Sequence, residues 1–158
     1  MAEFTHLAAD GSARMVDVSE RSVTDRASTA EGKVLLASTT VEAIRDAALP
    51  KGDVISTARL AGIMAAKRTS DLIPMCHPIA ITYADVALQV QDWGISISAD
   101  VRIKDRTGVE MEALTAVSVA GLTIIDMVKS VDPGATLTDV RVTTKSGGRS
   151  GDWRNPNG

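Results

Sequence analysis

The clearest pattern in the chain is a strict alternation of apolar and polar residues over positions 95–103. The apolar positions are Ile95, Ile97, Ala99, Val101 and Ile103, and the polar ones are Ser96, Ser98, Asp100 and Arg102. A period of two predicts a β-strand with one buried face, because successive side chains in a strand point to opposite sides. The preceding segment ADVALQVQ alternates similarly, and Asp92 and Gly94 are turn residues. Residues 81–104 are therefore predicted to form a β-hairpin.

Three segments have the spacing of amphipathic helices. The first is TTVEAIRDAAL (39–49), which begins at Thr39 or Thr40 as N-cap and is broken by the residues PKG. Asp53 is predicted to cap the second, VISTARLAGIMAAKRT (54–69). The third is a long helix from about Val109 to Val131, which ends at the residues DPG.

Two further strands complete the predicted layout, KVLLAS (33–38) and LTDVRVTTK (137–145). The resulting order, strand–helix–helix–strand–strand–helix–strand, is the ferredoxin-like split β-α-β order with one added helix. We therefore expect an α+β fold with an antiparallel sheet and helices on one face. The interpretation is a single domain over 1–158, with an extended N-terminal arm over 1–32 and a Gly-rich flexible tail over 145–158.

Composition narrows the classes of function. Of the 158 residues, 44% are hydrophobic but only 3% aromatic, so the core is expected to be aliphatic. A formal net charge of −3 argues against a general electrostatic attraction to nucleic acid or to a membrane. The single cysteine excludes an internal disulfide and fits a reducing compartment. No apolar run reaches the length of roughly 18 residues that a membrane span needs, so we expect a soluble cytoplasmic protein.

The segment SDLIPMCHPIAI places Cys76 next to His77, between Pro74 and Pro78. A structural zinc site needs four ligands, and the only other Cys or His in the chain is His6, so no metal site is expected. Neighbouring side chains in an extended chain point apart, which makes His77 a poor base for a Cys76 nucleophile. Cys76 is more simply a small buried side chain. The prolines restrict the backbone of His77, whose imidazole either binds a ligand or is a satisfied core group.

The long helix carries Glu110 and Glu112 in its first turn and Asp126 and Lys129 near its end. The acidic first turn suits the helix dipole, and Asp126 with Lys129 has the spacing of a surface ion pair. Because Asp126 lies in the apolar run LTIIDMV, we expect it to be partly buried, with a perturbed pKa. Glu112 and Asp126 are separated by roughly 21 Å along a helix. A site that uses both ends is expected to lie between subunits.

Basic residues outside the helices are candidates for binding phosphate. Lys51, in PKGD, is expected to be exposed. The tail KSGGRSGD places Lys145 and Arg149 around glycines, which let backbone N–H groups approach an anion. The glycine spacing does not match a Walker A motif, and the same tail reads equally well as a flexible terminus.

Four motifs in order resemble the cyclic pyranopterin monophosphate synthase family of molybdenum cofactor biosynthesis: ARMVDVS, KGDVISTARLAGIMAAKRTSDLIPMCHP, TGVEMEALTAVSVAGLTIIDMVK and KSGGRSGDW. The resemblance runs from Thr5 to Trp153. It implies a lyase that converts 3′,8-cyclo-7,8-dihydro-GTP into cyclic pyranopterin monophosphate and diphosphate. It also implies a hexamer with active sites between subunits and no resident cofactor, while leaving open whether Mg²⁺ accompanies the triphosphate.

The resemblance also assigns residues. It implies a catalytic role for Asp126, Lys51 and Lys129, and substrate binding by Met75, Cys76, His77, Glu110, Met111 and Glu112, with Lys145 or Arg149 as the tail cation. The chain departs from the common pattern at Met75, where Leu is usual, at Ile125, where Tyr is frequent, and at Arg149, where Lys is frequent. Arginine keeps the charge but loses a titratable amine.

The implied reaction needs acids and bases for ring opening and closure, for which Asp126, Lys129 and His77 are candidates. It also needs cations on the leaving diphosphate, for which Lys51, Lys67, Arg68 and the tail cations are available. One alternative is a non-catalytic ferredoxin-like module that binds a nucleotide or RNA, although ISISADVRI lacks the aromatic residues of RNA-binding sheets. A second is a hydrolase that uses Cys76 and His77, which thiol alkylation would inactivate.

Overall fold

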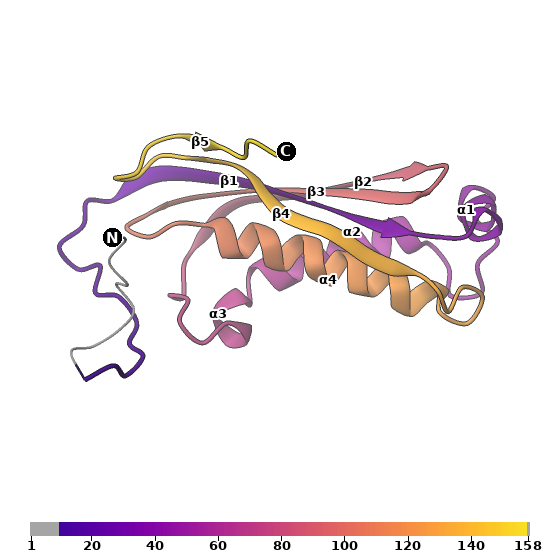
Figure 1. The fold of residues 1–158 in the computed structure, drawn as a ribbon, viewed down its shortest axis with the longest axis horizontal. Coiled ribbons are helices and arrows are strands. Elements are labelled where there is room, and N and C mark those ends of the chain that lie inside the picture. Colours follow the sequence, from indigo (N-terminus) through magenta and orange to yellow (C-terminus); the bar gives the residue numbers. More distant parts are fainter. Residues whose placement is uncertain (1–9, 158) are drawn as a thin grey trace.

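A computed structural model describes residues 10–157, so His6 lies outside the described residues. Its strands are β1 (Thr24–Leu35), β2 (Ile81–Gln91), β3 (Gly94–Asp105), β4 (Thr136–Ser146) and β5 (Trp153–Arg154), and its helices are α1 (Ser38–Arg45), α2 (Val54–Ala66), α3 (Thr69–Leu72) and α4 (Glu110–Val128). The strands form one antiparallel sheet in the order β2-β3-β1-β4-β5. Figure 1 shows α2 and α4 side by side on one face of this sheet. The ferredoxin-like α+β prediction is confirmed.

The hairpin predicted from the alternation is β2 and β3, and its inward side chains form the centre of the core. Ile95, Ile97, Ala99, Val101 and Ile103 are each at most 2% exposed. They pack against the buried face of α4, which includes Ala113, Ala116, Val117, Ala120 and Ile124. Helix α4 has the length and apolar composition of a membrane span. More than half of it is buried against the sheet and α2, however, so the core accounts for its apolar character.

The predicted extended arm over 1–32 is wrong in its last nine residues, because β1 begins at Thr24. The inward positions of this part of the strand are the small residues Ser28, Ala30 and Gly32. They are small because α4 lies close: a Cβ on Gly32 would lie only 2.7 Å from a Val117 methyl carbon. Large apolar residues are therefore absent from this stretch, and it does not show the alternation by which strands are recognised.

Other boundaries differ by a few residues. Helix α1 ends at Arg45 rather than Leu49, since Ala47 adopts a left-handed backbone conformation with φ 52°. The predicted cap of α2 is confirmed, because the Asp53 carboxylate accepts a hydrogen bond from the Ser56 backbone N–H at 3.0 Å. Helix α3 and strand β5 had no sequence signal. Strand β5 pairs with β4 inside the segment predicted to be a flexible tail, and β4 itself continues to Ser146.

Gly94, the first residue of β3 after the hairpin turn, is expected to tolerate no side chain. Its φ is 141°, and a Cβ there would overlap the backbone carbonyl of Val34 on the neighbouring strand. We expect Gly94→Ala to lower the free energy of unfolding by about 3 kcal/mol, because both backbone strain and a steric clash act. Urea denaturation measures this loss. Gly52→Ala is the matched control, since Gly52 also has a positive φ of 86° but open space around it. Equal losses in the two variants would contradict the clash.

Candidate active site

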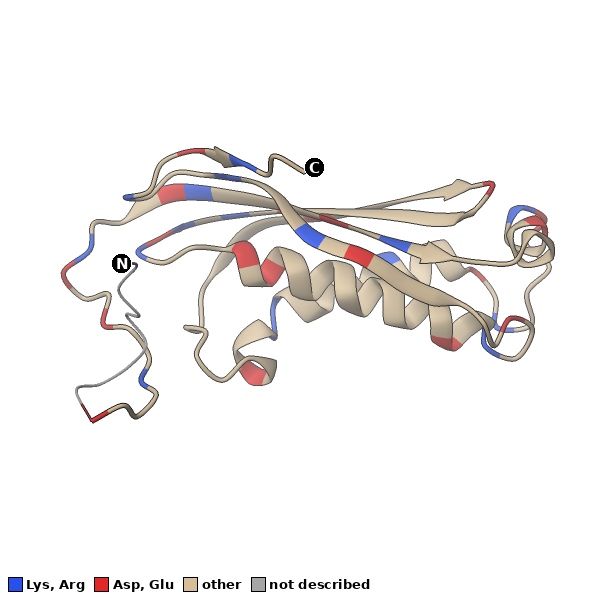
Figure 2. Ribbon diagram, viewed as in Figure 1, with Lys and Arg blue, Asp and Glu red and all other residues tan. Residues whose placement is uncertain are grey.

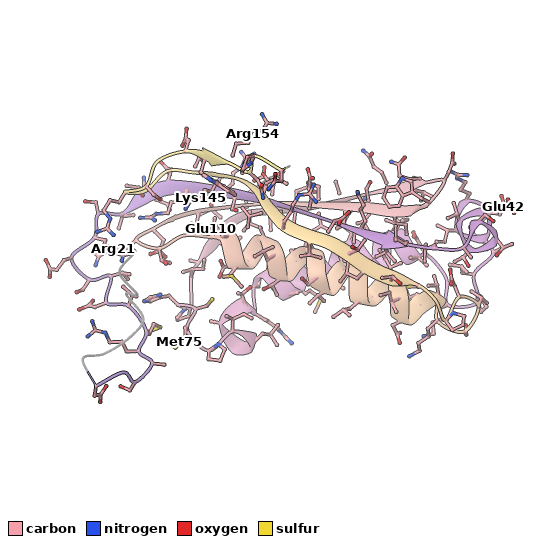
Figure 3. The ribbon with its side chains drawn as sticks, in the orientation of Figure 1. Arg21, Glu42, Met75, Glu110, Lys145 and Arg154 are labelled. Carbon is pink, nitrogen blue, oxygen red and sulfur yellow. The ribbon has the colours of Figure 1, made fainter. Side chains whose placement is uncertain are left out.

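A cavity of about 400 Å³ lies at the N-terminal end of α4. It is lined by all six residues predicted to bind substrate, Met75, Cys76, His77, Glu110, Met111 and Glu112. The first three lie in the segment between α3 and β2, and the others form the first turn of α4. Figure 3 shows Met75 and Glu110 at the same end of the molecule. The fold thus joins two motifs that are more than thirty residues apart in the sequence.

The N-terminal arm forms another wall of this cavity, with Val16, Val18 and Arg21. The His77 ring donates a hydrogen bond from Nε2 to the Val16 carbonyl at 2.9 Å. The Arg106 guanidinium donates a hydrogen bond to the Ser19 carbonyl in the next turn of the arm. Sequence reasoning missed Arg21 and Arg106, although the apolar residues of ARMVDVSE indicated that the arm docks. Arg21 makes no ion pair within residues 10–157, so its charge is available to a ligand in the cavity.

Glu112 is the buried acid of the cavity, at 4% exposed. Burial is the main cause that raises the pKa of Glu112 to about 7. A hydrogen bond from its own backbone lowers the pKa, and the nearby charge of Glu110 raises it further. Burial also raises the pKa of the Cys76 thiol, and the charge of Glu112 adds to this. A thiolate nucleophile requires the opposite shift. The cavity therefore favours proton exchange at Glu112 and disfavours a hydrolase that depends on Cys76.

The raised pKa of Glu112 predicts a pH-dependent stability. The unfolded chain releases this proton near pH 4.5 and the folded protein near pH 7, so the folded state binds more protons between these values. The free energy of unfolding should therefore fall as pH rises from 4.5 to about 7, by up to about 3 kcal/mol from this residue. Glu112→Gln, which is neutral and of the same size, should lose this slope and be more stable than the unaltered protein at pH 8.

The test is urea denaturation of both proteins between pH 5 and pH 8. The control is Glu42→Gln on α1, which changes a carboxylate of the same type that is far from the cavity in Figure 3. Parallel stability curves for the unaltered protein and Glu112→Gln would show that Glu112 titrates normally.

The three residues predicted to be catalytic lie together at the other end of α4. We call Lys51, Asp126 and Lys129 the lysine–aspartate cluster. Lys51 Nζ lies 3.0 Å from Asp126 Oδ2, and Lys129 Nζ lies 2.6 Å from Asp126 Oδ1. Lys51 also donates to the Asp126 backbone carbonyl at 2.7 Å. The hydrogen bond from Lys129, followed by that from Lys51, lowers the pKa of Asp126. The expected partial burial is wrong in this chain: the Asp126 side chain is 59% exposed, because it points from the helix toward the lysines and away from the core.

None of these three residues lines the cavity. Figure 2 shows the acidic positions of α4 at its two ends, with uncharged residues between them. Glu112 and Asp126 are fourteen residues apart on one continuous helix, or about 21 Å. One small ligand on a single chain cannot contact both the buried carboxyl group and the lysine–aspartate cluster.

Of the remaining predicted cations, only Lys145 lies near the cavity. Lys145, at the end of β4, forms an ion pair with Glu110 at 3.3 Å and so lies beside the cavity. Arg149, Lys67 and Arg68 are exposed and line neither the cavity nor the cluster. Of the two tail cations, the structure therefore brings Lys145 to the candidate site (Figure 3). In the described part of the chain, no three His, Cys, Asp or Glu side chains gather as metal ligands.

Comparison with known proteins decides the family. A model of the MoaC family matches residues 15–148, which include the arm residues that line the cavity, the rest of the cavity, the lysine–aspartate cluster and Lys145. The chain belongs to the MoaC family.

Curated MoaC relatives are similar along nearly the whole chain. A protein of Streptomyces griseus named cyclic pyranopterin monophosphate synthase is 59% identical over 150 residues, covering 95% of this chain and 85% of its own. A Streptomyces coelicolor protein of the same name is 59% identical, covering 94% and 88%. Cyclic pyranopterin monophosphate synthase 2 of Mycobacterium tuberculosis is 55% identical, covering 96% and 90%. The resemblance found in the sequence motifs is thereby confirmed.

Proposed function

We propose that this chain is a cyclic pyranopterin monophosphate synthase of molybdenum cofactor biosynthesis. The proposal rests on one observation: two segments that are distant in the sequence line the same cavity. These are Met75, Cys76 and His77 on one side and Glu110, Met111 and Glu112 on the other. Family membership supports the proposal, as do relatives of this name that match the chain over 85% and 88% of their own length. The reaction is a lyase step: the substrate 3′,8-cyclo-7,8-dihydro-GTP is rearranged to the cyclic monophosphate, and diphosphate leaves.

The cavity supplies groups for both parts of this chemistry. Glu112, with a pKa of about 7, exchanges protons readily at neutral pH, which suits ring opening and reclosure. His77 is held by the arm, so its ring is oriented before a ligand arrives. Arg21 and Lys145 flank the same space and are suited to stabilise charge on the phosphates. The high pKa of Cys76 makes its thiol a neutral packing contact.

The lysine–aspartate cluster enters the site from a second subunit. Lys51, Asp126 and Lys129 lie too far along α4 to reach a ligand in the cavity of their own chain. A two-fold axis that sets two α4 helices antiparallel would place the cluster of one subunit over the cavity of the other. We propose a hexamer built from such dimers, with each active site between two subunits. In it, Asp126 moves protons while both lysines stabilise the developing negative charge.

The proposal includes a cytoplasmic location and no resident cofactor. A lone cysteine fits a reducing compartment. Side chains of the cavity and the cluster supply the proton transfers and positive charges that the reaction needs.

The deciding experiment incubates the purified protein with 3′,8-cyclo-7,8-dihydro-GTP and follows the pterin by fluorescence after oxidation. Release of one diphosphate per pterin is expected, and the variant Cys76→Ala, which adds no bulk to the cavity, should retain activity. Tight binding of the substrate without any pterin would favour the non-catalytic binding module. A hydrolase activity that Cys76→Ala loses, with no pterin formed by the unaltered protein, would favour the cysteine hydrolase.

A further inference from the structure

A second hollow lies on the opposite face of the sheet from α2 and α4. Its volume is about 270 Å³, and four strands contribute to it. The polar side chains around it include Glu31, Lys33, Gln89, Ser98, Asp139 and Arg141. None of them belongs to the cavity or to the lysine–aspartate cluster. We call it the sheet groove.

An irregularity in β4 shapes this groove. The pairing of β1 with β4 shifts between Glu31 and Lys33, whose partners are Arg141 and Thr138, so β4 has two residues opposite the single Gly32. Within this bulge Asp139 adopts a left-handed conformation with φ 58°, which is uncommon for a residue other than glycine. Bulges of this kind redirect side chains and are common beside binding sites. Here the bulge lies directly before Arg141 on β4.

Arg141 is incompletely satisfied in this position. Its Nη1 donates a hydrogen bond to the Asp139 carbonyl at 3.3 Å, and its closest carboxylate, Glu31, is 4.0 Å from Nη2. Its Nε is buried and has no hydrogen-bond partner within residues 10–157. A buried N–H without an acceptor costs free energy, because it has lost its water and gained nothing in return. The Nε–H of Arg141 therefore needs an acceptor, and none of the described residues provides one.

The charges around the groove indicate which acceptor fits. Asp139 is paired with Lys33 at 2.9 Å, so these two charges largely cancel. Glu31 is about half exposed and contacts Arg141 only at the limit of an ion pair. Ser98 adds a hydroxyl, and the hydroxyl of Ser96 already donates to the Gln89 carbonyl at 3.4 Å. The four charges of the groove balance, but the Arg141 Nε–H still lacks an acceptor, and a group with two oxygens would match the parallel N–H groups of a guanidinium.

We propose that the sheet groove binds a small oxyanion, the carboxylate or phosphate of a soluble metabolite, with Arg141 as its principal ligand. The occupant is a free small molecule rather than a side chain of another protein, because the donors lie in a hollow among four strands and not on a ridge. This site is independent of the proposed synthase reaction, and Arg141→Gln is expected to leave synthase turnover unchanged.

The test observes the Arg141 Nε–H directly, by nitrogen–proton NMR of the full protein labelled at arginine and titrated with inorganic phosphate and then with acetate. The signal is assigned by its loss in Arg141→Gln. Saturable movement of this signal is expected with at least one anion. The control is Arg102 on the same sheet face, whose Nη2 and Nε already contact Asp100 at 2.6 and 3.3 Å, so that its signal should stay in place.

The backbone N–H of Ser98 reports binding in the variants. Arg141→Gln is expected to lower the affinity for the anion by about tenfold or more, and Arg102→Gln is expected to leave that affinity unchanged. A stationary Arg141 signal in the presence of both anions would overturn the proposal. A smaller oligomer formed by Arg141→Gln would also overturn it, since a neighbouring subunit would then fill the groove.

Discussion

Replacing Lys51 by alanine is expected to lower the rate of pterin formation by at least about a hundredfold, the typical cost of removing a group that stabilises transition-state charge. Lys51 lies outside the core, and its ammonium group contacts both the carboxylate and the backbone carbonyl of Asp126. The variant leaves Asp126 paired with Lys129 alone. It thereby removes a positive charge and raises the pKa of the aspartate toward its ordinary value, because the hydrogen bond from Lys51 is one cause of the lowered pKa.

The fold of this variant should be intact. The Lys51 and Asp126 side chains are 43% and 59% exposed, and ion pairs this exposed contribute little to stability because water screens them. Thermal unfolding should therefore shift by a few degrees at most. Lys104→Ala, which removes an exposed lysine from the sheet, is the matched control and should retain full activity. Normal turnover by the Lys51 variant would rule out the proposed role, and loss of activity together with the folded structure would leave it unsupported.

The second large effect is recovery of activity from two inactive variants. Lys51→Ala disables the lysine–aspartate cluster, and His77→Ala disables the cavity, where the ring contacts the arm. If each site combines the cavity of one subunit with the cluster of another, oligomers made from equal amounts of both chains contain some intact sites. Random assembly predicts about a quarter of the normal activity. The two chains are co-expressed with different tags, and mixed oligomers are isolated by both tags before the assay.

A matched pair of variants controls this experiment. Lys51→Ala and Asp126→Ala both alter the cluster, so every cluster in their mixed oligomers carries a defect, and no activity should return. Activity absent from isolated Lys51–His77 mixed oligomers would show that the two ends of α4 do not share a site. Equal recovery in both pairs would point to a cause other than complementary subunits.

Local patterns were sufficient for the elements whose inward residues are large. The alternation of Ile95 to Ile103 predicted a strand and its buried face, and Asp53 marked the start of α2. The first nine residues of β1 could not be recognised, because close contact with α4 requires small residues such as Ala30 and Gly32. These residues are small because the strand and the helix pack closely in the folded protein, and the local sequence pattern does not reveal that distance.

The same distinction applies to the candidate site. The motifs identified the types of residue, and the length of α4 already indicated that Glu112 and Asp126 are far apart. The exposure of Asp126 was predicted wrongly, since a charged residue in an apolar run can still point out of a helix. Arg21 was missed because nothing around it in the sequence shows that the arm folds back beside His77.

From the order of its residues alone, this chain could be assigned to its family, to an antiparallel sheet with helices on one face, and to a set of candidate catalytic side chains. These features follow from patterns within a few turns of helix or a few residues of strand. Packing alone decided which candidates meet in the cavity, how deeply Glu112 is buried, and that the bulge in β4 leaves Arg141 without an acceptor. Burial, solvation and contact between distant segments depend on the assembled fold, because each is set by atoms that are remote in the sequence.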